Sequence, residues 1–259
     1  MTDRIRLDGK VALVTGAAGV IGTAAMRLLA ERGARIVAVD CDQARLQAAV
    51  EDLPASAQAL ALTADVTRED QVADYVRRTI DQFGTVDVFY NNAGIEGDIT
   101  PIVEYSVESF RRVLEVNVVG VFLGLKHVLP AMRRQNRGSI INTASIAGLI
   151  GSPDIAAYCA SKHAVIGLTK SAALECAATA VRVNCVCPGL IDSRMLTAIV
   201  EGRNPDNAPV PTDKIVDRIP VRRLGQASEV ASIVAFLASD EASYVSGSAY
   251  TVDGGRTAS

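Results

Sequence analysis

The sequence predicts an α/β protein built on a doubly wound parallel sheet of about seven strands with helices on both faces. Short apolar runs rich in β-branched residues alternate with segments of helical periodicity along the whole chain. Such alternation gives parallel strands joined by right-handed crossovers. No linker, repeat or low-complexity segment interrupts the 259 residues, so we expect one domain over residues 1–259.

The expected strands are short apolar runs bounded by glycine or polar residues. The first, residues 10–15, leads into a glycine-rich turn, and the second, residues 35–40, ends on an acidic residue. The later strands repeat the pattern at residues 58–63, 86–90, 139–143, 181–187 and 249–252.

The expected helices fill the intervals, at residues 23–32, 43–52, 68–83, 106–135, 155–179 and 228–239. The third shows the helical spacing most clearly, with a stop at Gly84 and apolar residues at Val72, Tyr75, Val76, Ile80 and Phe83. Residues 193–225 contain several prolines and are expected to be irregular. A connection of that length in a compact domain is typical of a functional loop, so we expect a substrate lid there.

Composition and charge narrow the class of protein. Hydrophobic residues make up 49% and charged residues 21%, as in soluble globular proteins, and the net charge of −3 argues against nucleic acid as main partner. No apolar run reaches about 18 residues, which predicts no membrane-spanning helix. The polar N-terminus shows no signal-peptide core, so we expect a cytoplasmic protein with reduced cysteines. Cys185 and Cys187 have no His or further Cys grouped with them, which favours buried thiols over a metal site.

A glycine-rich segment at residues 15–22 joins the first strand to the first helix. Glycines there let backbone N–H groups approach a pyrophosphate, although an ordinary strand-to-helix turn would also use them. Asp40 ends the second strand, where a carboxylate can accept hydrogen bonds from the adenosine ribose and would repel a 2′-phosphate. Cys41 follows, with no Arg or Lys beside it, so this region favours NAD over NADP. The alternative role for Asp40 is a helix N-cap.

Two more segments follow expected strands and are candidate walls of a dinucleotide site. Asp65 and Val66 come after the third strand and would border the adenine. Residues 91–94, Asn-Asn-Ala-Gly, come after the fourth strand, where small side chains and amides would lie against the cofactor. Taken alone, this second segment would be interpreted as a turn, because Asn and Gly dominate turns.

Ser145, Tyr158 and Lys162 are the candidates for the reacting groups. Tyr158 and Lys162 are four residues apart, so they share one face of the expected helix, and Ser145 follows the fifth strand. In an open α/β sheet the three would meet at the carboxyl end of the strands, where ligands bind. A tyrosine pKa of about 10 must fall by about 3 units for work near neutral pH, and a cation one helical turn away supplies most of that.

Together these segments resemble the short-chain dehydrogenase/reductase family, with its Rossmann-like fold, from end to end. The matching motifs stand in the family's order: residues 15–22, Asp65, residues 91–94, Asn117, Ser145, residues 158–162, Pro188-Gly189 and residues 252–255. One departure is that the middle glycine of the family pattern Thr-Gly-x-x-x-Gly-x-Gly falls here on Val20, with Gly19 displaced by one. This departure concerns the phosphate contacts and not the fold.

The resemblance implies catalytic roles for four residues. Tyr158 is the general acid or base that exchanges a proton with the substrate oxygen. Lys162 holds the nicotinamide ribose and lowers the pKa of the phenol, while Ser145 hydrogen-bonds the substrate oxygen. Asn117 is similar to the family asparagine that holds a water linking Lys162 to bulk solvent.

The resemblance also implies a nicotinamide cofactor site, where Asp40 favours NAD over NADP, and no metal site is expected. Ile191, through its backbone, and Ser193 are at the positions that bind the carboxamide. The expected cofactor-binding residues are Gly16, Gly19, Val20, Ile21, Asp40, Asp65, Val66, Asn92, Ala93, Gly94, Tyr158, Lys162, Pro188, Gly189, Ile191 and Ser193.

The expected substrate pocket is apolar and small, which favours a neutral secondary alcohol or ketone, cyclic ones included. No cluster of Arg or Lys is placed to dock a phosphate or a carrier arm, although Arg194 and Arg203 leave that open. Residues 91–97 and 120–125 are similar to those of reductases of cyclic diketones. The pocket is expected between residues 95–99, residues 146–152, Leu190 and the lid. The residues singled out to line it are Ile95, Ser145, Ile146, Ala147, Ile150, Gly151, Leu190, Met195 and Leu196.

Two other functions remain open from the sequence. One is an NADPH-dependent 3-oxoacyl-thioester reductase of the same family, against which Asp40 argues. The other is a dinucleotide-binding regulatory protein without chemistry. Such proteins typically lose the tyrosine or the lysine, and this chain keeps both Tyr158 and Lys162.

Two helical segments, Val113–Met132 and Ala164–Ala180, are apolar nearly all round. A helix apolar on every face is buried on every face. One side can pack on the sheet, and the other is most simply covered by the same helix of another subunit. We therefore expect a homo-oligomer, with a tetramer favoured. The alternative is that residues 193–225 cover these helices within the chain.

Overall fold

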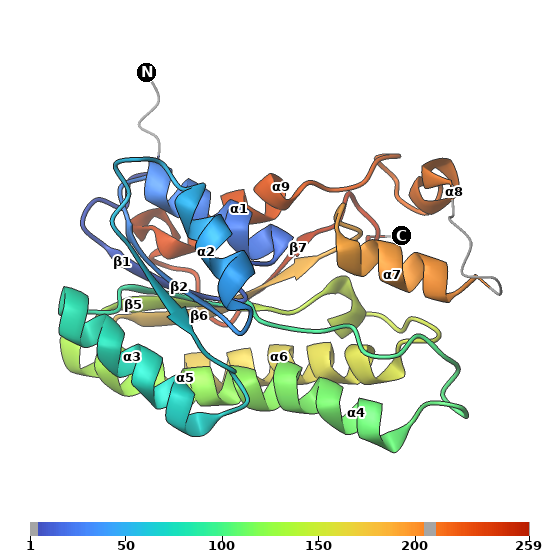
Figure 1. Ribbon diagram of the computed structural model, residues 1–259, viewed down its shortest axis with the longest axis horizontal. Helices are drawn as coiled ribbons and strands as arrows, with labels where there is room; N and C mark the ends of the chain where they lie inside the picture. Colours follow the sequence, from blue (N-terminus) through green and yellow to red (C-terminus); the bar gives the residue numbers. More distant parts are fainter. Residues whose placement is uncertain (1–4, 205–210, 259) are drawn as a thin grey trace.

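The chain forms a seven-stranded, all-parallel sheet in the order β3-β2-β1-β4-β5-β6-β7 (Figure 1). This computed structural model describes residues 5–204 and 211–258. The order reverses direction between β1 and β4, as in a doubly wound sheet, so the predicted fold class is confirmed. The strands are β1 (Val11–Thr15), β2 (Arg35–Asp40), β3 (Ala59–Thr63), β4 (Val88–Asn91), β5 (Gly138–Thr143), β6 (Val181–Pro188) and β7 (Ala249–Val252).

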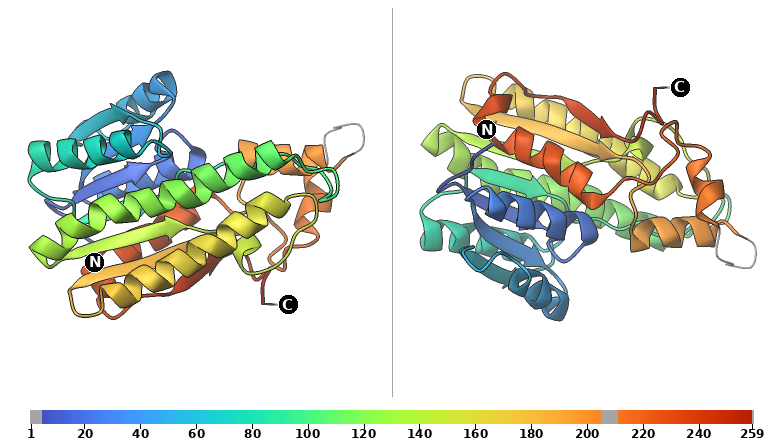
Figure 2. Two further views of the ribbon diagram at one scale, coloured as in Figure 1. Left: turned by 90° about the horizontal axis from the view of Figure 1, so that it is seen from below. Right: turned by 90° about the horizontal axis from the view of Figure 1, so that it is seen from above.

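Helices cover both faces of the sheet (Figures 1 and 2). On one face lie α1 (Val20–Glu31), α2 (Gln43–Glu51) and α9 (Ala227–Ala238), and on the other α3 (Glu69–Phe83), α5 (Gly120–Gln135) and α6 (Ala156–Glu175). Side chains of each strand alternate between two apolar cores. Val11 and Leu13 enter the core under α3, α5 and α6, whereas Ala12 and Val14 enter the core under α1 and α9. Burial on both faces explains why the strands appear in the sequence as unbroken apolar runs.

The helix expected over residues 106–135 is continuous but irregular. It runs as α4 (Val107–Leu114), a π-helical segment η1 (Glu115–Val119) and α5. By length and composition Val107–Gln135 could span a membrane, with half of its most apolar window buried in the molecule. The core helix of a folded domain passes the same test of length and composition, and the expectation of no membrane-spanning helix stays a prediction.

The region expected to be an irregular lid contains helix. It holds α7 (Arg194–Gly202) and α8 (Thr212–Val216), while residues 205–210 lie outside the described part. α7 forms because Ser193 caps it by accepting a hydrogen bond from the Leu196 N–H. The prolines of residues 193–225 all come after the end of α7. The proline density of the whole region hid this helical segment.

Other differences from the expected elements are at their ends. α1 begins at Val20 rather than at residue 23, because Gly19 serves as its N-cap. α6 ends at Glu175 rather than at Thr179, whose hydroxyl instead donates to the carbonyl of Cys176. A 3-10 turn, η2 (Ile146–Gly148), follows Ser145, and η3 (Asp240–Ala242) follows α9.

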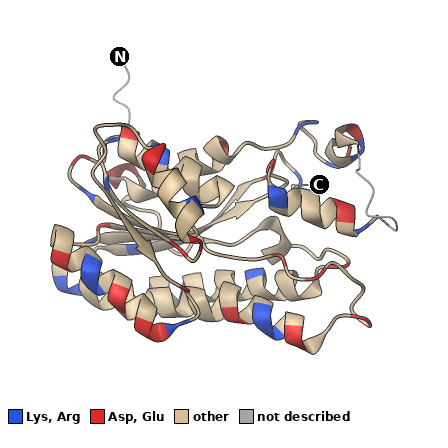
Figure 3. Ribbon diagram, in the orientation of Figure 1, with Lys and Arg blue, Asp and Glu red and all other residues tan. Residues whose placement is uncertain are grey.

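The outer surface of α3 carries both signs of charge (Figure 3). Arg77 pairs with Asp74 one turn before it and with Asp81 one turn after it, the latter at 2.7 Å. Such a mixed surface is that of a solvated helix face and contrasts with the uniformly basic face typical of nucleic-acid binding.

Candidate active site

Ser145, Tyr158 and Lys162 lie at the carboxyl end of the sheet, as predicted. Ser145 directly follows β5, and α6 carries the other two on one buried face. The Ser145 hydroxyl donates to the carbonyl of Pro188 at the end of β6, at 3.4 Å, and accepts from the N–H of Ala147 at 3.1 Å. All three residues are at most 8% exposed. The structure therefore brings the predicted reacting groups together in a site shielded from water.

The protein's own groups do not activate the Tyr158 phenol. Burial raises the pKa of Tyr158 to about 12, and a hydrogen bond with Ser145 opposes this rise. Lys162 lies 5.4 Å from the centre of the Tyr158 ring, and its ammonium donates to the carbonyl of Thr143 at 2.8 Å. Lys162 was expected to supply most of the fall in this pKa, with the positive nicotinamide ring adding to it, and burial of the phenol acts in the opposite direction.

Burial also acts on Lys162. The side chain is 3% exposed, and desolvation lowers its pKa from 10.5 to about 8. The amine is still mostly protonated at neutral pH, so it supplies a cation beside the phenol. Its other neighbours are the buried thiols of Cys185 and Cys187, which were predicted to be buried and are fully so.

Asn117 lies in the π-helical segment η1, and its side chain is fully engaged by protein groups. Its amide oxygen accepts from the Ile95 N–H at 2.8 Å, and its amide nitrogen donates to the Ile95 carbonyl at 2.9 Å and the Ser161 hydroxyl at 3.0 Å. The side chain thus braces the segment after β4 against α6. A single π turn within a helix often marks a functional position.

The glycine-rich turn has the geometry that a dinucleotide requires. Gly16 has φ +62° and lies so near the next loop that a Cβ would be 2.8 Å from the Cα of Ala93. Gly19 is the N-cap of α1, and no side chain caps the first-turn N–H groups of Val20 and Ile21. These N–H groups and the helix dipole fit a pyrophosphate. Val20 is 47% exposed, so its departure from the family pattern is accommodated at the surface.

Asp40 is held at the end of β2 by two backbone donors. Its carboxylate accepts from the N–H of Ala18 at 3.0 Å and of Asp42 at 3.1 Å, which leaves lone pairs for ribose hydroxyls. The alternative role as N-cap of α2 was wrong, because Asp42 is the N-cap and accepts from the N–H of Arg45. Arg45, which sequence reasoning missed, donates to the carbonyl of Ala18 at 3.1 Å. The signal that could have identified Arg45 is its position in the first turn of the helix that follows Asp40.

The segments after β3 and β4 form the adjoining walls. Asn92 donates to the carbonyls of Thr15 and Gly16, both at 3.2 Å, and accepts from the Thr143 hydroxyl at 3.0 Å. At Gly94 a Cβ would be 3.2 Å from the Asn117 amide oxygen and 3.4 Å from the Lys162 amine, so a larger side chain there would crowd both groups. Asp65 accepts two bonds from Thr67. Val66 contacts Gly120 at the start of α5, where a Cβ would come within 2.9 Å of it.

The residues after β6 lie at the same end of the sheet, where the predicted carboxamide-binding hydroxyl of Ser193 is already bonded to protein groups. Gly189, after Pro188, is so close to the last strand that a Cβ would be 2.8 Å from the Cα of Asp253. The Ser193 hydroxyl donates to the carbonyl of Ile191 at 3.1 Å and accepts from Leu196 at 3.3 Å. A carboxamide at Ser193 would therefore share its hydroxyl with the cap of α7.

An apolar cluster lies over the phenol. Ala147, Ile155 and Tyr158 pack with Ile99 of the segment after β4, with Cys159 of α6 and with Met195 and Ile199 of α7. Of the predicted pocket residues, Ser145, Ala147 and Met195 are thus at the phenol, and Ile95 is bonded to Asn117. Gly151 is exposed, with nothing within 4 Å of a Cβ, while Ile146, Ile150, Leu190 and Leu196 are half-buried. Ile99 and Ile199 lie in two of the segments expected to line the pocket, residues 95–99 and the lid, whereas Ile155 was missed.

Helix α7 is attached at both ends by arginines. Arg194 pairs with the buried carboxylate of Glu96 at 2.9 Å, and Arg203 donates to the Ser152 hydroxyl at 2.8 Å and the Pro153 carbonyl at 2.7 Å. These were the two cations that the sequence left open for a phosphate or a carrier arm. Each is bonded to protein groups instead.

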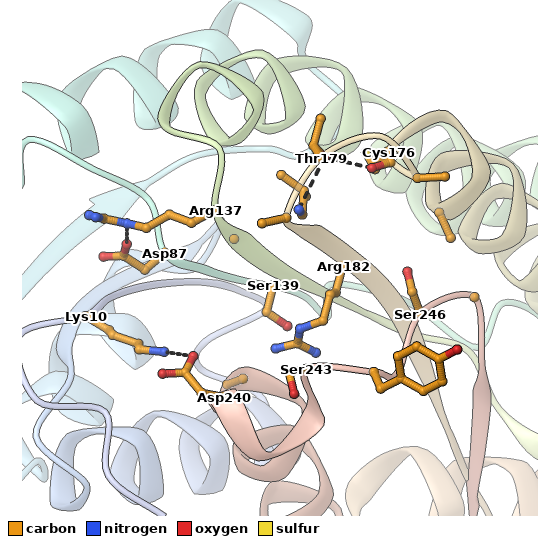
Figure 4. Close-up of a pocket in the computed structure, with 18 of the residues that line it drawn as sticks. Lys10, Asp87, Arg137, Ser139, Cys176, Thr179, Arg182, Asp240, Ser243 and Ser246 are labelled. Atoms are coloured by element: carbon orange, nitrogen blue, oxygen red, sulfur yellow. Dashed lines mark hydrogen bonds and ion pairs between the residues drawn. The ribbon is translucent and has the colours of Figure 1, made fainter.

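A cavity of about 1120 Å³ lies at the opposite edge of the sheet (Figure 4). It is lined by residues at the amino ends of the strands, and its charges are paired, Lys10 with Asp240 at 2.6 Å and Arg137 with Asp87 at 2.9 Å. None of the predicted site residues lines it. The carboxyl edge, where the reactive side chains meet, is the candidate active site, because volume alone supplies no chemistry.

Comparison with known proteins identifies the family. A family model described as enoyl-(acyl carrier protein) reductase matches residues 16–257. The chain belongs to the short-chain dehydrogenase/reductase family, whose members are oxidoreductases acting on CH–OH groups with a nicotinamide dinucleotide as typical cofactor. The resemblance stated from the motifs is thereby confirmed.

Three relatives and two solved structures show the range of similarity. Levodione reductase of Leifsonia aquatica is 39% identical over 98% of this chain and 96% of its own. Cyclohexanol dehydrogenase of Acinetobacter sp. (strain SE19) is 40% identical over 97% and 96%. A 3-oxoacyl-(acyl-carrier-protein) reductase of Thermotoga maritima is 40% identical over 97% and 99%. The crystal structure of levodione reductase matches with a TM-score of 0.95 at 38% identity, covering 98% of this chain and 100% of that one. NAD+-bound xylitol dehydrogenase matches with 0.91 at 38%, covering 96% and 99%.

Proposed function

We propose that this protein interconverts a neutral secondary alcohol and its ketone, cyclic ones included, with NAD(H). The observation that carries the proposal is the apolar cluster formed by Ile99, Ile155 and α7 over a buried tyrosine, lysine and serine. Such a surface favours an uncharged substrate. Relatives named for cyclic substrates, levodione reductase and cyclohexanol dehydrogenase, support the cyclic part of the proposal.

Each reacting residue has one task in this proposal. The hydroxyl of Ser145 donates a hydrogen bond to the substrate oxygen and fixes its position. Tyr158 Oη takes the proton of the alcohol during oxidation and returns it during reduction. The Lys162 ammonium stabilises the phenolate by its charge. A bound nicotinamide supplies the hydride acceptor or donor and adds positive charge in its oxidised form.

NAD is the proposed dinucleotide because the Asp40 carboxylate would repel a 2′-phosphate. Arg45 lies close by and gives some compensating charge, so we expect NADPH to be used poorly rather than rejected. Asp40→Ala should raise kcat/KM for NADPH relative to NADH by about tenfold or more, the effect of one removed repulsive charge. Steady-state rates with both dinucleotides measure the ratio. Wild-type preference for NADPH would contradict the cofactor assignment.

The second candidate is reduction of a 3-oxoacyl thioester with NADPH, favoured by the similarity to the Thermotoga maritima reductase. Against it stand Asp40 and the pairing of Arg194 and Arg203 with protein groups, which leaves neither cation free for a carrier arm. The non-enzymatic alternative, a dinucleotide-binding regulatory protein, is less favoured because the reacting groups are all present and converge.

The proposal is tested with a panel of substrates read out by NADH absorbance. Cyclic and acyclic secondary alcohols with NAD+ should give turnover, and acetoacetyl thioesters with NADPH should give at least tenfold less. Higher kcat/KM for the thioester would support the second candidate. If no substrate of the panel reacts while dinucleotide binding is intact, the result would support a dinucleotide-binding regulatory protein.

We also propose a homotetramer located in the cytoplasm. Phe122 on α5 and Leu174 on α6 are large apolar side chains that stay 48% and 77% exposed, on helices that otherwise pack against the sheet. α7 does not belong to the core that these two helices form, so the alternative cover by residues 193–225 is not favoured. Light scattering after size exclusion should give four chains per particle. A monomer would contradict this.

A further inference from the structure

Val20 lies where the family pattern has its middle glycine, and none of the proposed catalytic steps uses its side chain. It is the first residue of α1 and is 47% exposed. Ile21 and Ala24 of the same helix pack against the core under α1 and α9. The Val20 side chain instead faces outward at the N-terminus of α1, where an apolar group gains little from packing.

The neighbouring glycines are required by contacts within the protein. A Cβ at Gly22 would overlap the carbonyl of Gly16, and a Cβ at Gly19 would be 3.2 Å from the same oxygen. At position 20 a side chain meets solvent, so valine is compatible with the fold there. The consequence of this valine is therefore to be sought in what binds at the turn.

Hydrogen bonds within the protein fix the backbone of the turn. The Ala18 N–H donates to the Asp40 carboxylate at 3.0 Å, and the Gly19 N–H donates to the Gly16 carbonyl at 3.1 Å. In a helix the Cα–Cβ bond tilts toward the N-terminus, and a β-branched side chain has few rotamers. The isopropyl group of Val20 therefore stays beside the uncapped N–H groups at the start of α1.

We propose that Val20 sets the affinity of the phosphate part of the dinucleotide site and makes it lower than glycine would. A pyrophosphate bound at the first N–H groups of α1 would have an apolar group beside it in place of water, which is unfavourable for a charged ligand. The N–H groups and the helix dipole remain, so binding is weakened and not lost. Release of the dinucleotide becomes faster, and such a step often limits turnover. The inference rests on the dinucleotide site and holds whatever the alcohol substrate is.

The test is equilibrium binding of NADH, followed by its fluorescence, to wild type, Val20→Ala and Val20→Gly. Val20→Gly should lower Kd by about fivefold or more, with Val20→Ala in between, because the apolar group beside the phosphate is removed in two steps. The rate of NADH release, measured by stopped-flow displacement, should fall by a similar factor.

Two smaller ligands, measured by competition with NADH, locate the effect. ADP-ribose keeps the pyrophosphate, so Val20→Gly should improve its binding as much as that of NADH. Adenosine lacks phosphate, so its binding should not change. An equal gain for adenosine would overturn the proposal, because the valine would then act on the nucleoside and not on the phosphates.

Val107→Gly is the matched control. Val107 is also the first residue of a helix, α4, and is 64% exposed after the Ser106 cap. Both variants place glycine at the same helix position, so thermal unfolding should shift similarly in the two. Only Val20→Gly should change the Kd of NADH.

An unchanged or higher Kd for NADH in Val20→Gly would overturn the proposal, and so would failure of wild type and both Val20 variants to bind NADH and ADP-ribose. These measurements need no alcohol substrate. Absence of turnover with the substrate panel, with NADH bound as expected, therefore counts against the proposed function alone.

Discussion

Replacing Tyr158 by Phe is expected to lower kcat by about a thousandfold, because it removes the phenol that exchanges a proton with the substrate oxygen in the proposed mechanism. The ring remains, so its packing with Ala147 and Ile155 persists. Dinucleotide affinity, measured by NADH fluorescence, should change by less than about threefold, since a proton-transfer group contributes mainly to the transition state. Initial rates of alcohol oxidation measure the loss.

Tyr75→Phe is the matched control for this variant. Tyr75 lies on α3 with a hydroxyl that is buried and finds no hydrogen-bond partner among the described residues. Removing that hydroxyl should leave kcat unchanged and the protein at least as stable. A Tyr158→Phe protein that retains more than about a tenth of the wild-type kcat would show that another group moves the proton, since general acid–base catalysis contributes far more.

Lys162→Met is expected to lower kcat by about a hundredfold or more, because the phenolate loses its adjacent cation. Stability should move the other way. Burial that lowers a lysine pKa from 10.5 to about 8 corresponds to about 3 kcal/mol lost at neutral pH. Leaving the Thr143 carbonyl without its donor costs about 2 kcal/mol. The free energy of unfolding at pH 7 should therefore rise slightly or stay level while activity collapses.

The same shift predicts how stability depends on pH. Since the folded pKa is the lower one, the unfolded chain binds more protons between about pH 8 and 10.5. Lys162 therefore weakens the fold fully below that window, and the loss is recovered as the pH rises through it. Denaturant unfolding should show this rise in wild type and lack it in Lys162→Met. The control is Lys170→Met, an exposed position on the same helix, which should change neither activity nor the pH trend.

Much of the fold could be predicted because periodicity is a local property of the chain. Each strand of the sheet was found within two residues, since burial on both faces leaves an unbroken apolar run. The π turn at Asn117 could not be predicted. The side chain that explains it bonds to Ile95 and Ser161, residues far away in sequence. The proline-rich composition of residues 193–225 likewise hid α7, whose cap and apolar spacing are short signals.

For the site, residue types and spacing predicted which groups could react, and contacts across the chain decided how they are arranged. Ile155 was missed because nothing local distinguishes it from a core residue, and Arg45 because its hydrogen bond to the Ala18 carbonyl joins residues far apart in the sequence. The cation beside the phenol was predicted correctly in place, whereas the rise that burial causes in the pKa of Tyr158 was not predicted. Desolvation depends on everything packed around the ring, which no spacing rule contains.

The sequence by itself determined the class of fold, the family and the reacting trio, since strand alternation and the Tyr158–Lys162 spacing are set along the backbone. Only the tertiary structure decided that Arg194 and Arg203 are bonded to the protein and that Glu96 lies buried with Arg194 as its partner. The physical reason is that the interaction energy of a charge depends on its partner and on its exposure to solvent. Both come from segments that only folding brings together.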